Sequence, residues 1–70
     1  MAELDTGIPS FRWVQAAIRD QKTVSVKLAT SEEVGGRVRW QDTECICLLD
    51  EREQDVLLWR NAIAWMRVRT

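Results

Sequence analysis

The spacing of apolar residues changes once along the chain, from steps of three and four residues to steps of two. Phe11, Val14 and Ile18 follow the first spacing, which gathers apolar side chains on one face of a helix. Pro9 suits a first helical position, because the N–H that it lacks has no partner there in any case. The pattern therefore predicts a helix over about residues 9–20.

Five short segments with the character of β-strands follow this helix. They are residues 24–29, 34–40, 45–49, 56–59 and 62–68. The first two alternate apolar and polar positions, whereas the third is apolar throughout and predicts a strand buried on both faces. Gly36 inside the second segment indicates a bend or a bulge, because glycine weakens a strand unless the backbone needs its freedom. The predicted fold class is mainly β with one N-terminal helix, the five antiparallel strands forming a bent, partly open barrel.

A chain of 70 residues allows one small domain. We expect a polar lead-in over residues 1–8 and a single domain over residues 9–70. The last two strand segments are apolar, and as edges of an open barrel they would present unpaired backbone groups. The simplest way to cover these edges is pairing with a second copy of the chain. Head-to-tail contacts of that kind close into a ring when the rotation between copies allows it.

The composition removes several classes of function. Ten basic and eleven acidic residues give a net charge of −1, which argues against a generic polybasic nucleic-acid binder. The chain has no histidine, and we recognise no nucleophile–base pair, so we expect no enzymatic activity, no cofactor and no metal site. The acidic start of the chain lacks the apolar region of a signal peptide, so we expect a cytoplasmic protein.

Two cysteines and one aspartate are candidates for a reactive role, but their predicted positions favour structural roles. Cys45 and Cys47 would share one face of a strand, with Cα atoms about 6.6 Å apart and parallel side chains, which is poor disulfide geometry. We expect them to be buried, reduced thiols. Asp42 lies in a turn between strands, where a carboxylate more often accepts hydrogen bonds from nearby backbone N–H groups.

Four tryptophans in so short a chain suit both packing and binding. We assign Trp40 to the core, because tryptophan is an ordinary large filler of small cores. We place Trp65 at a contact between copies, where such anchors dominate. Trp59 is the candidate for stacking on a ligand, and Trp13 lies beside the main apolar face of the helix, available to a partner.

Several segments together resemble the Hfq family, the bacterial Sm-like proteins. The predicted helix is followed by the stretches Val24-Ser-Val-Lys-Leu28, Val34-Gly-Gly-Arg-Val38, Gln41-Asp42 and Trp59-Arg60-Asn61-Ala62-Ile63. The stretch RWQDTECICLLDE is similar in particular to the cyanobacterial branch, and the likeness covers residues 8–68. The resemblance implies the Sm-like fold, a homohexameric ring closed through the fourth and fifth strands, and RNA binding without catalysis.

The resemblance also implies three RNA-binding surfaces, of which the proximal pore is the best preserved here. Trp59, Arg60 and Asn61 stand where the family has an aromatic-Lys-His tripeptide that holds U-rich RNA. Thr43 and Glu44 stand where the family has a Gln-Phe pair, so the base-stacking ring is missing. Since stacking contributes about 1–3 kcal/mol per base, we expect weakened binding at Trp59, Arg60, Asn61 and Thr43.

The other two surfaces depart further from the family pattern. Lys27 and the Ser31-Glu32-Glu33 turn replace the residues that bind A-rich RNA on the distal face, and the added carboxylates oppose phosphate. We expect little A-rich binding there. The rim that the resemblance implies is reduced to Arg12 and Arg19, with Asp20 offsetting part of the charge.

Two functions therefore remain open from the sequence. The first is a post-transcriptional regulator whose hexameric ring binds U-rich RNA with reduced affinity. The second is a protein-interaction ring whose RNA sites have decayed. The cyanobacterial branch is associated with motility driven by type IV pili, so the resemblance implies a protein partner such as the pilus machinery.

Overall fold

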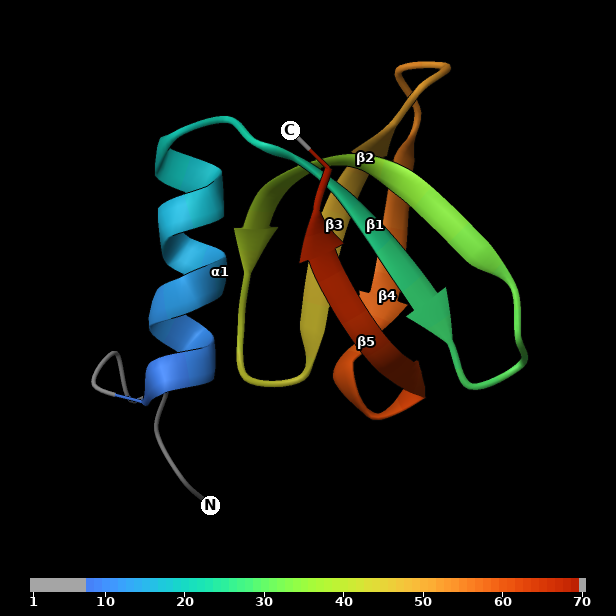
Figure 1. Cartoon of the computed structure of the whole chain (residues 1–70), viewed down its shortest axis with the longest axis horizontal. Coiled ribbons are helices and arrows are strands. Elements are labelled where there is room, and N and C mark those ends of the chain that lie inside the picture. The colour runs from blue at the N-terminus through green and yellow to red at the C-terminus, as the bar shows by residue number, and fades with distance from the viewer. Residues whose placement is uncertain (1–7, 70) are drawn as a thin grey trace.

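The computed structural model describes residues 8–69, which form one helix and five strands (Figure 1). The elements are α1 (Pro9–Arg19), β1 (Thr23–Leu28), β2 (Glu33–Gln41), β3 (Cys45–Asp50), β4 (Asp55–Trp59) and β5 (Ile63–Val68), with a single 3-10 turn at Arg60–Ala62. Pro9 occupies the start of α1, where its ring favours the first turn. The order and type of the elements agree with the sequence prediction. Residues 1–7, most of the predicted lead-in, lie outside the described part.

The strands form one antiparallel sheet in the order β4-β3-β2-β1-β5. The sheet is strongly bent, and β2, the longest strand, arches across it in Figure 1. β4 and β5 are the two edges and do not pair with each other. The predicted fold class, one helix followed by five antiparallel strands in a partly open barrel, is confirmed.

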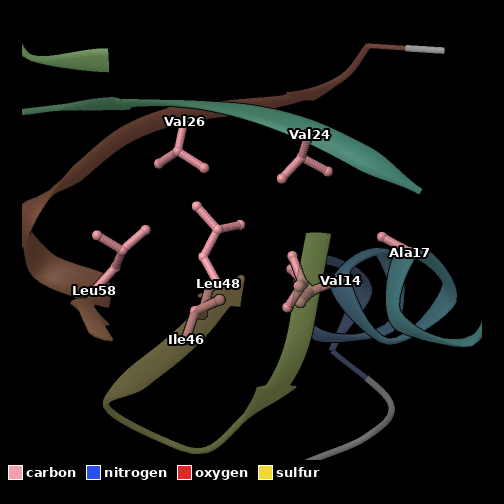
Figure 2. Close-up of a cluster of buried hydrophobic side chains, with 8 residues drawn as sticks. Val14, Ala17, Val24, Val26, Ile46, Leu48 and Leu58 are labelled. Carbon is pink, nitrogen blue, oxygen red and sulfur yellow. The ribbon is translucent and has the colours of Figure 1, made fainter. Parts of the chain in front are cut away.

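The core lies inside the bend of the sheet and is closed by α1. Val24 and Val26 of β1 and Leu48 of β3 are the most completely enclosed side chains. Figure 2 shows the two valines pointing toward Leu48 across the bend. The neighbours that complete the cluster include Val14 and Ala17 of α1, Val38, Ile46 and Leu58.

A β-bulge in β2 overturns one prediction, the assignment of Trp40 to the core. The pairing of β2 with β3 shifts register between Val38 and Trp40. Val38 is buried in the core, but the extra residue reverses the alternation beyond it, so Trp40 faces away from the core and is 46% exposed. The same reversal turns Gln41 toward α1, where its side chain forms hydrogen bonds.

The two cysteines lie on β3 as free, buried thiols, as predicted. Burial raises the pKa of both thiols, and the nearby carboxylates of Asp42 and Asp55 add to the rise at Cys45 and Cys47 respectively. A raised pKa keeps a cysteine protonated and unreactive near neutral pH. Within residues 8–69, no helix has the length and apolar character needed to span a bilayer.

Candidate functional site

The guanidinium of Arg60 lies at the centre of a network on the helix side of the sheet. Its Nε–H donates to the carbonyl oxygen of Asp42 at 3.0 Å, and its Nη2 donates to the side-chain oxygen of Gln41. Its carbon atom lies 5.9 Å from the centre of the Phe11 ring, within the range of a cation–π contact. The backbone N–H of Arg60 also donates to the carbonyl of Glu44 at 2.8 Å. We call Phe11, Gln41, Asp42 and Arg60 the Arg60 network.

Gln41 connects this network to the helix. Its Nε2 donates to the backbone carbonyl of Phe11 at 3.1 Å and to Oε1 of Gln15 at 3.0 Å, while its own Oε1 accepts from Arg60. One amide side chain therefore holds α1, β2 and the 3-10 turn in place. Periodicity alone does not mark Gln41 and Gln15 as site residues, because only the bulge in β2 turns Gln41 toward the helix.

The turn between β2 and β3 is built by Asp42, as predicted. Its carboxylate accepts hydrogen bonds from the backbone N–H groups of Glu44, at 2.9 Å, and Cys45, at 2.7 Å. These two bonds hold the pKa of Asp42 below its usual range, with the charge of Arg60 adding a smaller effect. Thr43 is exposed in this turn and lies between Asp42 and Glu44, whose carbonyl oxygens both accept hydrogen bonds from Arg60, so its backbone lies beside Arg60.

Trp59 lies on the opposite side of the sheet from the partners of Arg60. In the register of β3 and β4, Trp59 pairs with Cys45, whereas their neighbours Leu58 and Ile46 point into the core. Trp59 therefore faces outward and is 51% exposed. Within a single chain, Arg60 and Thr43 are neighbours and the indole of Trp59 is directed away from both. Asn61 is exposed in the 3-10 turn that follows.

An apolar patch lies on the outer face of the sheet, the face directed away from α1 and the core, where β2, β3 and β4 run side by side. Trp40, Leu57 and Trp59 are each about half exposed there, and they lie around the buried Cys45 and Cys47. Leu57 and Trp59 belong to the edge strand β4. Large apolar side chains gathered beside an open edge are typical of a surface that another chain covers.

A second apolar surface lies on the helix side, near the other edge. A hollow of about 270 Å³ opens between α1 and β5, and its walls include Trp13, Val14, Ile46 and Met66. Arg60 lies at its margin. Trp13 is 43% exposed there, as expected from its place beside the apolar face of the helix.

The two rim candidates lie on α1, seven residues apart, and line one shallow hollow of about 170 Å³. Arg19 is paired with the carboxylate of Asp20 at 3.1 Å, so its charge is partly neutralised. This contact raises the pKa of Arg19 and lowers that of Asp20. Arg12 makes no ion pair within residues 8–69.

Lys27 and Glu33 face each other on the outer face of the sheet, on β1 and β2. Ser31 adopts a positive φ of 78° in the turn that joins these strands. Among the residues that the structure describes, no group of three potential ligands lies close enough to hold a metal ion.

Comparison with known proteins identifies the class to which this fold and site belong. The family described as Hfq related matches residues 8–68, so the chain belongs to the Hfq-related family. A crystal structure of an Hfq protein from the cyanobacterium Anabaena sp. matches with a TM-score of 0.80 and 35% sequence identity, covering 90% of this chain and 100% of that one. The resemblance to the Hfq family and its cyanobacterial branch is confirmed.

A second solved structure supports the fold alone. It is described as the pleiotropic translational regulator Hfq and matches with a TM-score of 0.81 at 17% identity. The match covers 86% of this chain and 98% of that one. No curated protein sequence matches the chain.

Proposed function

We propose that this protein is a ring-forming, Hfq-type regulator that binds U-rich RNA weakly on its helix side and does no catalysis. The observation that carries the proposal is the Arg60 network, which holds one guanidinium beside the exposed Thr43 turn in a chain of the Hfq-related family. A held guanidinium keeps its remaining N–H donors aligned for a phosphate group. The indole of Trp59 is directed away from this guanidinium, so Trp59 belongs to the site only if a neighbouring copy completes it. Asn61 follows Arg60 in the 3-10 turn and is proposed as a further RNA contact.

The ring is supported by the two edges of the sheet. β4 and β5 each present an unpaired backbone edge, and β4 adds the exposed side chains of Leu57 and Trp59. Pairing β4 of one copy with β5 of the next would satisfy both edges and bring Leu57 and Trp59 beside the outward-facing side chain of Trp65. We propose six copies, as the family resemblance implies.

Weak affinity is expected because the only cation of the network is already engaged. Two of the guanidinium nitrogens of Arg60 bond to Asp42 and Gln41, and Glu44 adds a carboxylate in the same turn. The turn also lacks an aromatic side chain on which a base could stack. We therefore propose that oligo-U binds with lower affinity than a site with a free cation and a stacking ring would allow.

Fluorescence anisotropy with labelled oligo-U and oligo-A of 18 nucleotides tests this function. Arg60→Ala should weaken oligo-U binding about tenfold, since a charge-assisted hydrogen bond contributes about 1.5–3 kcal/mol. Arg52→Ala is the matched control, because it removes the same charge from an exposed turn and should leave binding within twofold. Equal losses in the two variants, or no oligo-U binding at low salt, would reject the RNA function.

A second candidate is a protein-interaction ring whose RNA sites have decayed. The internal engagement of Arg60 favours it, because two of the guanidinium nitrogens already bond within the chain and fewer N–H donors remain for a phosphate. The sequence resemblance suggests a partner such as the type IV pilus machinery. An affinity pull-down from the native host, with and without nuclease, separates the candidates, since partners captured through RNA are lost after nuclease treatment.

A further inference from the structure

The outer face of β5, β1 and β2 carries an ordered set of polar side chains that the Arg60 network does not use. In the register of these strands, Arg67 pairs with Ser25, and Ser25 pairs with Gly35. The next row places Trp65 beside Lys27, and Lys27 beside Glu33. Paired residues in neighbouring strands point to the same face of a sheet.

The guanidinium of Arg67 is held over the indole of Trp65, with its carbon atom 4.6 Å from the ring centre. Stacking of this kind leaves the N–H groups at the edge of the guanidinium free to donate to an anion. Arg69 lies across Gly35, because a Cβ at that position would approach its Nη1 to 2.5 Å. From there Arg69 donates to Glu51 at 3.1 Å.

These residues enclose a polar hollow of about 490 Å³. Its lining includes Ser25, Glu33, Trp65, Arg67 and Arg69. The hollow therefore presents cations, one hydroxyl and one carboxylate to the same ligand.

Not all of the charged side chains in this region form ion pairs with one another. Lys27 and Arg67 make no ion pair within residues 8–69, whereas Arg69 is already paired with Glu51. Glu33 is the one acid of the two rows. The face thus offers two unpaired cations against one unpaired carboxylate, although the whole chain carries a net charge of −1.

We propose that this face of β5, β1 and β2 binds an acidic polypeptide segment in an extended conformation. Carboxylates at alternate positions of such a segment are about 6.6 Å apart, close to the roughly 7–8 Å between diagonal positions on neighbouring strands, which Arg67 and Lys27 occupy. Arg67 and Lys27 would bind the carboxylates, and Glu33 would accept from a backbone N–H of the segment.

A polypeptide suits this face better than a nucleic acid does. The indole of Trp65 is half-buried and Arg67 lies over it, so it offers no open ring for a base. Glu33 repels a phosphate chain, whose backbone has no N–H to donate to it, whereas a peptide backbone does. This inference deepens the second candidate function and rests on it, since it gives the protein partner its chemistry.

The test measures binding of a fluorescein-labelled 12-residue peptide of alternating Glu and Ser to the assembled protein at low ionic strength. Arg67→Ala and Lys27→Ala should each weaken binding about tenfold, and Arg67→Lys should weaken it less. Arg52→Ala removes the same charge from the turn between β3 and β4 and should change the affinity for the peptide less than twofold. Glu33→Gln should tighten binding, because the amide oxygen can still accept the peptide N–H but no longer repels the carboxylates of the peptide. A peptide of alternating Gln and Ser should not bind. Size-exclusion chromatography checks that each variant assembles as the parent does. The Lys27→Ala variant changes an interior strand, so its result does not depend on the β5 edge.

Three results would overturn the inference. The first is an absence of peptide binding by the assembled protein. The second is an equal loss in Arg52→Ala, which would mean that only net charge matters. The third is tighter binding of oligo-A than of the peptide, with the loss again at Arg67, which would assign the face to nucleic acid. If the peptide does not bind but a protein partner is still captured after nuclease treatment, this surface is rejected and the second candidate function stands.

Discussion

Two neighbouring glycines in β2 allow a sharp test of how the sheet bends. An ideal Cβ at Gly36 would lie 2.1 Å from the carbonyl oxygen of Leu49, 2.8 Å from its carbonyl carbon and 2.9 Å from the Cα of Asp50. Ordinary contact begins near 3.4 Å, so Gly36→Ala forces the backbones of β2 and β3 apart by more than 1 Å. At Gly35 the only close atom is Nη1 of Arg69, the end of a flexible side chain.

The two alanine variants should therefore differ widely in stability. Gly36→Ala should lower the free energy of unfolding by about 3 kcal/mol or more, at or beyond the upper end of overpacking effects, because backbone rather than side chain must move. Gly35→Ala displaces an exposed ion pair and should change the free energy of unfolding by less than about 1 kcal/mol. For a domain of this size we expect the melting temperature of Gly36→Ala to fall by at least about 12 °C.

Thermal unfolding by circular dichroism, with all proteins at one concentration, measures the difference, since association makes the melting temperature depend on concentration. Size-exclusion chromatography on the same samples shows whether assembly is retained. The reasoning about the bend fails if Gly36→Ala melts within 4 °C of the parent, or if Gly35→Ala is destabilised as much as Gly36→Ala.

Three further predictions concern the turn, the thiols and the helix contact. Because the pKa of folded Asp42 lies below its ordinary value of 3.8, the stability that its ionised form contributes is complete above that value and is lost as pH falls through the lower folded pKa. Urea unfolding between pH 6 and pH 2 should show a weaker acid dependence in Asp42→Asn, and an unchanged slope would contradict this assignment. Cys45 and Cys47 should react with Ellman's reagent at pH 8 only after unfolding, and immediate labelling of the folded protein would contradict their burial. Gln41→Ala should destabilise the protein by about 1–2 kcal/mol and speed amide exchange in α1, whereas Gln15→Ala, which removes one of these bonds, should do less; equal effects would refute the central role of Gln41.

The order and class of the elements could be predicted from the sequence because they depend on local periodicity. A helix repeats every 3.6 residues and a strand every two, so the change of spacing after residue 20 is visible without any tertiary contact. The buried thiols of β3 and the backbone hydrogen bonds of Asp42 were also predictable, since both follow from a strand or turn assignment alone.

The tertiary structure decided which residues meet across the sheet. One extra residue between Val38 and Trp40 reverses the alternation of β2, so a tryptophan expected in the core faces outward and Gln41 reaches the helix. A bulge of this kind has no local signature that periodicity can detect. The partners of Arg60 follow from the same reversal, and the row that joins Arg67 to Ser25 follows from the pairing of the last strand with the first. Contacts between residues far apart in the chain depend on register, which packing fixes and local sequence does not.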